Sequence, residues 1–433
     1  MQKIAKKTII VTAKLQKSGG ITGLRDIATQ SNPYWSLIMH QLRGIAQLYG
    51  FQPVETAILE EQKVYADYYK NQPQILDRII YTQSGGKSLG VRSAVLPSVL
   101  RHYVQSKINT EEQPLSKWLY IGNVAEIDER QAIHFSYQFG LEVLGVFNHL
   151  TEAQVISAMW DLTQRLGLGE DVSLEINTSG DVAVQTAYAN VLKDFLKGKE
   201  FELCESCNEH LRGRILNVLR CNEVGCQLLT AEAPAIVDFL APDERKRFTD
   251  TLEALDELGL PYQLNQLYVG PEGSSGTSLV IKYKKGNETV VIGEASHHEL
   301  LLKNITGKAM PAFGFSGSLS ALSRALELSE VEATHSISSE VFLVPLGELA
   351  SKRSLRLFRD LIAVDVKVYD HFGTIGVKNQ LKHAEECKAP IALIMGQKEA
   401  MDDMVILRDV KSGMQEVFSY DKIIAEVKKR LER

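Results

Sequence analysis

Residues 118–145 read WLYIGNVAEIDERQAIHFSYQFGLEVLG, and this stretch decides the fold. It begins with four apolar residues, passes through a polar segment, and ends in apolar residues that alternate with polar or small ones. A period of two is typical of β-strands, so the stretch predicts two antiparallel strands joined by a loop. Gln138 and Glu142 are four residues apart on the second strand and therefore share one of its faces. That face could line a pocket, or it could be a solvated face of the sheet.

The same stretch resembles the second signature motif of class II aminoacyl-tRNA synthetases, and its end, QFGLEVLG, is similar to histidyl-tRNA synthetases. The resemblance covers nearly all of residues 20–433. It implies an α+β fold: a class II synthetase-like antiparallel sheet core with a helical insertion, and a C-terminal α/β anticodon-binding-like domain. The implied boundaries are 1–182 and 263–326 for the core, 183–262 for the insertion, 327–338 for a linker and 339–433 for the C-terminal domain.

The composition fits a globular protein of two or three domains, with 433 residues, 44% of them hydrophobic and 24% charged. The net charge of −6 means that the chain has no overall positive charge that would attract a polyanion. Residues 339–433 hold 16 Lys and Arg against 15 Asp and Glu, a balance of +1, so the remainder carries −7. An RNA partner is therefore expected at the C-terminal domain. We expect no membrane span, since no run of about 18 apolar residues occurs. We also expect no signal peptide and a cytoplasmic location.

The family's arginines are missing from the positions that the resemblance assigns to them. Glu126 falls on the arginine of the second motif, and Asp128 falls on the glutamate two residues later. Residues 269–274 replace the histidine-specific Arg-Gly-Leu-Asp-Tyr-Tyr run, and residues 318–321 replace the Gly-Leu-Glu-Arg of the third motif. Arginines clamp phosphates because they bind them bidentately. These losses predict a retained fold that lacks the chemistry of adenylate formation.

Four residues remain as candidates for a ligand pocket: Gln138, Glu142, Arg92 and Arg101. Arg92 precedes the segment at which the family carries a Pro-Glu-Gly-Thr run that binds the amino group of histidine. Arg101 lies on the first turns of a predicted helix, where it could also be a surface residue.

Two further arginines could substitute for the missing ones. Arg130 lies in the loop of the central stretch, and Arg324 lies about one helical turn beyond the third motif. Each could equally be an ordinary loop or surface residue. His297 and His298 are adjacent, so we expect them on opposite faces, exposed rather than paired as metal ligands.

Four of the five cysteines lie in the predicted insertion, in a pattern that suits a metal. Cys204 and Cys207 form C-x2-C, and after 13 residues Cys221 and Cys226 form C-x4-C. Two close pairs of soft ligands are typical of structural zinc sites. His210 could replace one ligand. The alternative is four free thiols.

Three functions remain open. The first is a histidyl-tRNA synthetase-like protein without aminoacylation activity, which binds tRNA or other RNA, a small ligand, or a partner enzyme. The second is a divergent but active histidine–tRNA ligase, which would need ATP and Mg²⁺. The third is a regulatory subunit of the ATP phosphoribosyltransferase type, although such subunits usually lack the C-terminal domain. The resemblance also implies a homodimer, but the proline of the family's first motif falls on Ala57.

Overall fold

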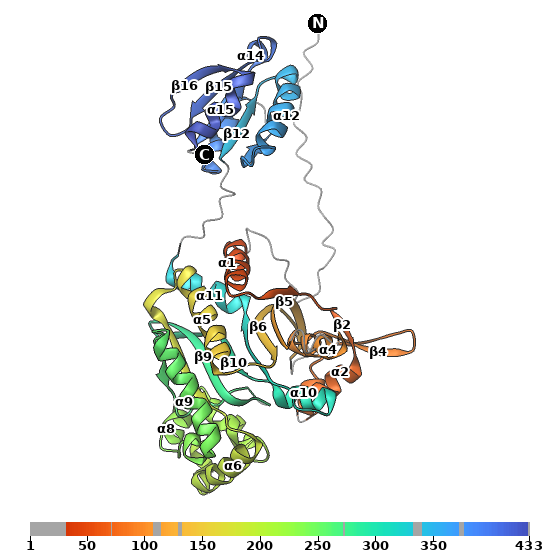
Figure 1. Cartoon of the computed structure of the whole chain (residues 1–433), viewed down its shortest axis with the longest axis vertical. Coiled ribbons are helices and arrows are strands. Elements are labelled where there is room, and N and C mark those ends of the chain that lie inside the picture. The colour runs from red at the N-terminus through yellow and green to blue at the C-terminus, as the bar shows by residue number, and fades with distance from the viewer. Residues whose placement is uncertain are drawn as a thin grey trace. The chain divides into compact units, whose positions relative to one another are not determined.

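The computed structural model describes residues 32–70, 72–106, 114–128, 132–271, 273–331, 340–371 and 376–431. The chain divides into two compact units, residues 1–332 and residues 333–433, which are described separately (Figure 1). Helix α11 (Leu319–Ser329) lies near the end of the described part of the first unit. The predicted linker 327–338 therefore begins too early, because its first three residues are helical.

An eight-stranded sheet forms the centre of the first unit, in the order β1-β5-β6-β11-β10-β9-β7-β8. Its strands are β1 (Gln52–Val54), β5 (Leu115–Ile127), β6 (Ile133–Gly145), β7 (Val172–Thr178), β8 (Gln263–Leu264), β9 (Ser275–Lys285), β10 (Glu288–His297) and β11 (Ala312–Ser318). The β1–β5 and β7–β8 pairs are parallel and the others are antiparallel. The antiparallel pair predicted from residues 118–145 is confirmed as β5 and β6.

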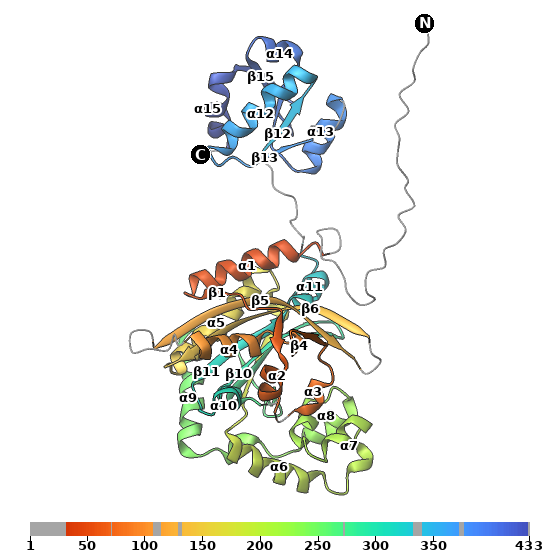
Figure 2. The ribbon, with the colours of Figure 1, turned by 90° about the vertical axis from the view of Figure 1, so that its right-hand side faces the viewer.

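Helices cover both faces of this sheet (Figure 2). One face packs against α1 (Trp35–Leu48), α5 (His149–Arg165) and α11, and α9 (Pro242–Glu257) packs on α5. The other face carries α2 (Gln62–Tyr68), α4 (Leu96–Ser106) and α10 (Glu299–Thr306). A short helix, α3 (Pro73–Leu76), and a small sheet of β2 (Leu59–Glu61), β4 (Lys87–Val91) and β3 (Tyr81–Ser84) complete this second layer.

The alternation along β6 divides its side chains between these two layers. Phe139, Leu141 and Val143 are fully buried, as expected for a strand packed under helices. Gln138 and Glu142 point to the opposite face, which α2, α4 and α10 cover.

The insertion is a set of short helices around its own small core. It comprises α6 (Val182–Leu196), α7 (Glu205–His210), α8 (Val224–Thr230) and the 3₁₀ segments η2 (Glu200–Glu202), η3 (Ile215–Arg220) and η4 (Ile236–Phe239). Tyr188, Leu192 and Ile236 are fully buried in this core, together with Cys207 and Cys226 at 1% exposure each. A core this small provides little hydrophobic stabilisation, so the short segments need an additional source of stability.

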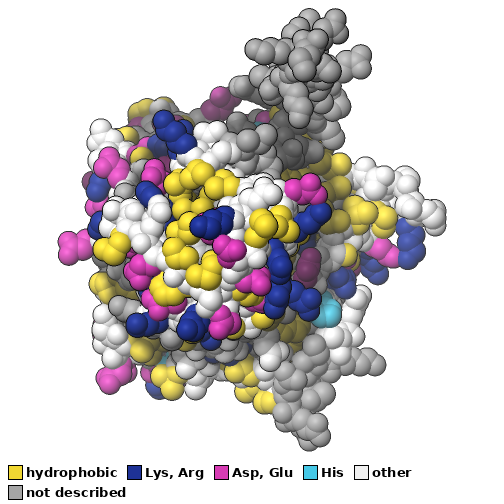
Figure 3. All heavy atoms as spheres, turned by 90° about the horizontal axis from the view of Figure 1, so that it is seen from above, with side chains coloured by type: hydrophobic (Ala, Val, Ile, Leu, Met, Phe, Trp, Pro, Cys, Tyr) yellow, Lys and Arg dark blue, Asp and Glu magenta, His cyan; other side chains and the backbone are white. Residues whose placement is uncertain are grey.

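The C-terminal unit is a five-stranded mixed sheet in the order β13-β12-β14-β15-β16. Its elements are β12 (Val341–Pro345), α12 (Glu348–Ile362), β13 (Val368–Asp370), α13 (Val377–Glu386), β14 (Ile391–Met395), α14 (Gln397–Met401), β15 (Met404–Asp409), β16 (Gln415–Ser419) and α15 (Tyr420–Arg430). The predicted alternation of strands and helices is thus present. Figure 3, which draws the whole chain from above, shows Lys and Arg side chains interspersed with Asp and Glu.

Candidate functional site

The strand register gathers polar residues on the face of the sheet beneath α2 and α10. Glu142 pairs with Gly314, which pairs in turn with Ser296. In the next row Gly140 pairs with Ser316, and Ser316 pairs with Glu294. Residues paired directly across antiparallel strands point to the same face, so these groups share one floor.

A cavity of about 280 Å³ lies above this floor. The strands contribute Gln138, Glu294, Ser296 and Ser316 to it, and His298 follows β10. The remaining lining comes from the helical layer and three connecting segments: Tyr68, Tyr69, Gln72, Ala94, Leu96, Pro271, Ser274 and Leu301. The cavity therefore combines an apolar and aromatic wall with a few polar groups, as small-molecule sites commonly do.

Gln138 is held in position by the backbone of the neighbouring layer. The Val95 backbone N–H donates to Gln138 Oε1 at 3.1 Å. This bond occupies the amide oxygen, so the amide nitrogen is the group that can donate to a bound ligand.

Glu142 lies completely buried under the cavity. Its Oε2 atom is 3.2 Å from His298 Nδ1, while Oε1 has no hydrogen-bond partner among the described residues. Burial raises the pKa of Glu142, and the nearby His298 opposes that rise. The carboxylate fits only because position 314 is a glycine, since a Cβ there would collide with it.

Glu294 is fixed by an arginine from the insertion. Arg220 Nη2 donates to both Glu294 carboxylate oxygens, at 2.8 and 3.1 Å, and Arg220 Nη1 donates to the Val269 carbonyl oxygen at 2.8 Å. Tyr268 Oη also lies 3.1 Å from Glu294 Oε1. Arg220 lines a second hollow of about 550 Å³, which shares Gln72 and Pro271 with the first. The charge of this arginine is therefore already matched by a carboxylate.

The two arginines predicted for the pocket, Arg92 and Arg101, do not line it. The Arg92 guanidinium is buried against Asn123, with Nε donating to the backbone oxygen and Nη2 to the side-chain oxygen, each at 2.8 Å. Its Nη1 donates to Thr56. Arg101 donates to the buried carboxylate of Glu60 at 2.7 Å. Both predictions are corrected, because Asn123 and Thr56 hold the Arg92 guanidinium and Glu60 holds that of Arg101.

The two proposed substitute arginines do not supply the missing charge in the described structure. Arg324 forms exposed ion pairs with Glu288 at 2.8 Å and Glu327 at 3.1 Å. Arg130 lies outside the described residues. Glu126, at the position of the family's arginine, pairs with Arg78 at 3.2 Å.

The prediction that His297 and His298 are exposed is wrong. They do lie on opposite faces, but each faces a carboxylate beneath a packed layer. His298 is 6% exposed beside Glu142, and His297 Nε2 lies 3.3 Å from Glu152 Oε1 with its side chain 15% exposed. Adjacent residues in extended backbone point their side chains to opposite faces of the sheet. Their positions in the sequence do not show which of these faces other elements cover.

The four cysteines of the insertion meet in space. Their Sγ atoms all lie within 4.8 Å of one another, and the Cys204 and Cys221 sulfurs are 3.8 Å apart. His210 lines the hollow beside them. All four cysteines are reduced in the structure.

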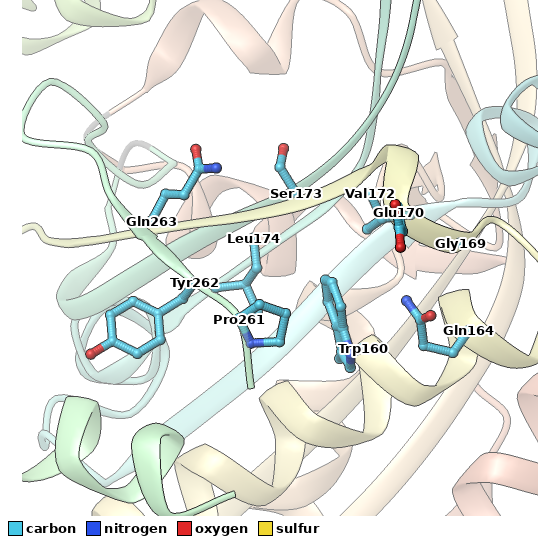
Figure 4. A pocket seen from close by; sticks show the side chains of 10 residues that line it. All are labelled: Trp160, Gln164, Gly169, Glu170, Val172, Ser173, Leu174, Pro261, Tyr262 and Gln263. Carbon is cyan, nitrogen blue, oxygen red and sulfur yellow. The ribbon is translucent and has the colours of Figure 1, made fainter. Parts of the chain in front are cut away.

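Another hollow, of about 380 Å³, lies at the β7–β8 edge of the sheet. Figure 4 shows the Trp160 ring between Pro261 and Gln164 in this hollow. Only Glu170 among its lining residues is charged. It lacks the convergent polar groups of the cavity above β6, so we place the candidate site at that cavity.

Sequence reasoning missed Glu294 and His298 as pocket residues, and it missed Arg220 as the partner that holds Glu294. A signal existed for Glu294, because the family's imidazole-pocket run aligns with residues 293–297. Arg220 gave no signal, since its partner lies 74 residues away on another element.

Comparisons with known proteins agree with this architecture. Residues 23–210 match the family described as histidyl-tRNA synthetase, and residues 340–430 match an anticodon-binding domain. The structure of S. aureus histidyl-tRNA synthetase superposes with a TM-score of 0.73 at 22% identity, covering 99% of this chain and 100% of that one. Together these findings define a class II synthetase-fold protein with an anticodon-binding domain.

Within that class, the chain is similar to histidyl-tRNA synthetases, whose family model matches residues 23–210. A histidine–tRNA ligase of Dehalococcoides mccartyi is 28% identical over 414 residues, which are 94% of this chain and 99% of that protein. One from Halothermothrix orenii is 28% identical over 417 residues, with coverages of 94% and 98%. A Bacillus halodurans structure titled ATP phosphoribosyltransferase regulatory subunit/histidyl-tRNA synthetase has a TM-score of 0.62 at 17% identity, with coverages of 88% and 98%.

Among the described residues, no helix is long and apolar enough to span a membrane.

Proposed function

We propose that this protein is a histidyl-tRNA synthetase-like binding protein that does not form an aminoacyl-adenylate. One observation carries the proposal: among the described residues, no lysine or arginine lines the cavity above β6. The protein instead uses this cavity for a small polar ligand without phosphate groups, and it uses its anticodon-binding domain for tRNA or a related RNA.

Charge is the reason that the cavity does not suit a triphosphate. Glu294 faces the cavity, and Glu142 lies buried beneath it. Arg220 is the arginine beside the cavity, and a phosphate would have to displace Glu294 to bind it. In related chemistry, removal of a single group that stabilises the developing charge slows the reaction by roughly 10²–10³-fold. Lys70 and Lys303 line a neighbouring hollow that shares Gln72 and Leu301 with the cavity, but they are not in its lining.

The test of lost catalysis is histidine-dependent ATP–pyrophosphate exchange by the full chain. We expect no exchange above a protein-free blank, while the Halothermothrix orenii ligase assayed in parallel serves as the positive control. Clear histidine-dependent exchange would establish the second candidate function, an active ligase. That candidate is favoured by the relatives named histidine–tRNA ligase, which match 94% of the chain.

Calorimetry tests the ligand part of the proposal with histidine, histidinol and Mg²⁺–ATP as probes. Histidine or histidinol is expected to bind, and ATP is not. Gln138→Ala should weaken the binding by about 3- to 10-fold, the size of one lost neutral hydrogen bond. Gln164→Ala, in the separate hollow at the sheet edge, is the matched control and should leave the affinity unchanged. Absence of binding by all three probes at millimolar concentration contradicts the ligand part, and it also removes the histidine-sensing regulatory subunit as an alternative.

The anticodon-binding domain supports the RNA part of the proposal. Because its charges are mixed, we expect weak binding of bulk tRNA that falls steeply as salt increases. A filter-binding titration between low and physiological salt measures this. If no tRNA binds at low salt, a partner enzyme replaces RNA as the expected target. We also propose a homodimer, located in the cytoplasm, and light scattering of the purified chain measures its mass.

A further inference from the structure

Four sulfur atoms in the insertion have the separation that one metal ion requires. A tetrahedral zinc site with Zn–S bonds of about 2.3 Å places its sulfurs about 3.8 Å apart. The Cys204 and Cys221 sulfurs are 3.8 Å apart, and all four lie within 4.8 Å of one another. A disulfide would need about 2.05 Å between sulfurs. An iron–sulfur cluster attaches its cysteines to different irons, which spreads them further than a single ion does.

Backbone N–H groups surround the sulfurs in the way that stabilises thiolates. The Cys204 N–H donates to Cys226 Sγ at 3.2 Å, and the Cys207 N–H donates to Cys204 Sγ at 3.5 Å. The Glu223 N–H donates to Cys221 Sγ at 3.4 Å. Such bonds orient the ligands of a metal and offset their negative charge. Two of the four side chains, Cys207 and Cys226, are 1% exposed, so the site is closed on one side by the core of the insertion.

A single peptide bond joins the cysteine cluster to Arg220, the arginine that holds Glu294 of the candidate pocket. Cys221 follows Arg220 directly, and Arg220 crosses to Glu294 and Val269 of the sheet core. The segment that carries Arg220 is the 3₁₀ segment η3, and the poor hydrogen-bond geometry of a 3₁₀ helix gives it little stability of its own. A metal held by Cys221 would fix the end of this turn.

We propose that Cys204, Cys207, Cys221 and Cys226 bind one structural zinc ion, and that this site holds Arg220 against the candidate pocket. Four thiolates complete the tetrahedral coordination, so no open position is left for catalysis. Zinc binding releases the thiol protons, and its free energy contributes to the folding of the insertion. The proposal stands independently of the pocket's ligand and of any loss of aminoacylation.

Elemental analysis and X-ray absorption of the full chain, purified without chelator, test the site directly. We expect about one zinc per chain and a first shell of four sulfurs at about 2.3 Å. Cys221→Ser should reduce the zinc content at least several-fold, whereas Cys387→Ser is the matched control and should retain it, because Cys387 lies in the C-terminal unit. Absence of zinc after reconstitution, iron in its place, or a shell of nitrogen or oxygen would overturn the proposal. The absorption spectrum of the unaltered protein decides the question even if a variant fails to fold.

Hydrogen exchange tests the coupling to Arg220. Removal of zinc by a chelator should increase exchange at residues 204–226 and also at residues 268–270, which Arg220 contacts through Val269. Arg220→Ala should keep the zinc and increase exchange only at residues 268–270. If zinc removal leaves residues 268–270 unchanged, the site is structural for the insertion alone, and its role in holding Arg220 is refuted.

Discussion

The buried pair of Glu142 and His298 makes a quantitative prediction for the variant His298→Leu. The substitution removes the group that faces Glu142 Oε2 at 3.2 Å and leaves both carboxylate oxygens without a described partner. A buried carboxylate in that state takes up a proton. Starting from a carboxyl pKa of about 4.3 in the unfolded chain, protonation at pH 7 costs about 3.7 kcal/mol, at about 1.36 kcal/mol per pH unit. The loss of stability relative to the unaltered protein is therefore at most about 4 kcal/mol at pH 7 and at most about 1 kcal/mol at pH 5, because the pKa of Glu142 is already raised when His298 is present.

The sign of the pH dependence follows from the raised pKa of Glu142. The folded variant keeps its proton in a pH range where the unfolded chain releases it, so stability falls as the pH rises from about 4.3 toward the folded pKa. In the unaltered protein His298 opposes the rise in pKa, so the same decline ends at a lower pH. The variant should therefore continue to lose stability at pH values where the unaltered protein has levelled off.

Urea unfolding between pH 5 and pH 8, followed by tryptophan fluorescence, measures this effect. All three tryptophans, Trp35, Trp118 and Trp160, lie in the first unit, so the signal reports on that unit alone. The double variant Glu142→Gln, His298→Leu removes the charge and is expected to lose the additional pH dependence. Equal pH slopes for His298→Leu and the unaltered protein, or no recovery in the double variant, would refute the reasoning.

Two further substitutions test the packing around the pocket. Gly314→Ala should destabilise the first unit by about 1–3 kcal/mol, because the added methyl group meets the Glu142 carboxylate. The control is Gly44→Ala in α1, whose methyl group meets no atom within 4 Å; it should be neutral or stabilising by up to about 1 kcal/mol. Equal effects of the two substitutions in urea unfolding would contradict the close contact at position 314. Arg92→Met should lower the free energy of unfolding by at least about 2 kcal/mol, since it leaves the oxygens of Asn123 and Thr56 without their donor. The control Arg324→Met removes an exposed ion pair and should lower it by less than about 1 kcal/mol. The reverse order would count against a structural role for Arg92.

Local pattern was sufficient to predict the framework of this protein. The alternation from Tyr137 to Val143 marks β6, and the spacing of Cys204, Cys207, Cys221 and Cys226 predicts the sulfurs that meet in space. These signals depend on a few consecutive residues or on short spacings.

The destinations of charged side chains were not predictable in this way. Arg92 was expected in the pocket, but its direction is set by Asn123 and Thr56, on segments 31 and 36 residues away. The exposure of His298 depends on the helical layer above the sheet, which the strand pattern does not encode. In both cases the partner that decides the position is distant in sequence, so only the assembled fold identifies it.

The contact of Arg220 with Glu294 limits how the insertion can be exchanged among related proteins. A chimera that receives residues 183–262 from a relative with a different residue at position 220 would leave Glu294 without its ion-pair partner. The foreign segment could fold correctly and still alter the cavity above β6. Residues 183–262 therefore affect the cavity through a contact with a residue outside the segment. An exchange experiment on this protein needs to transfer the residue at position 294 together with the residue at position 220.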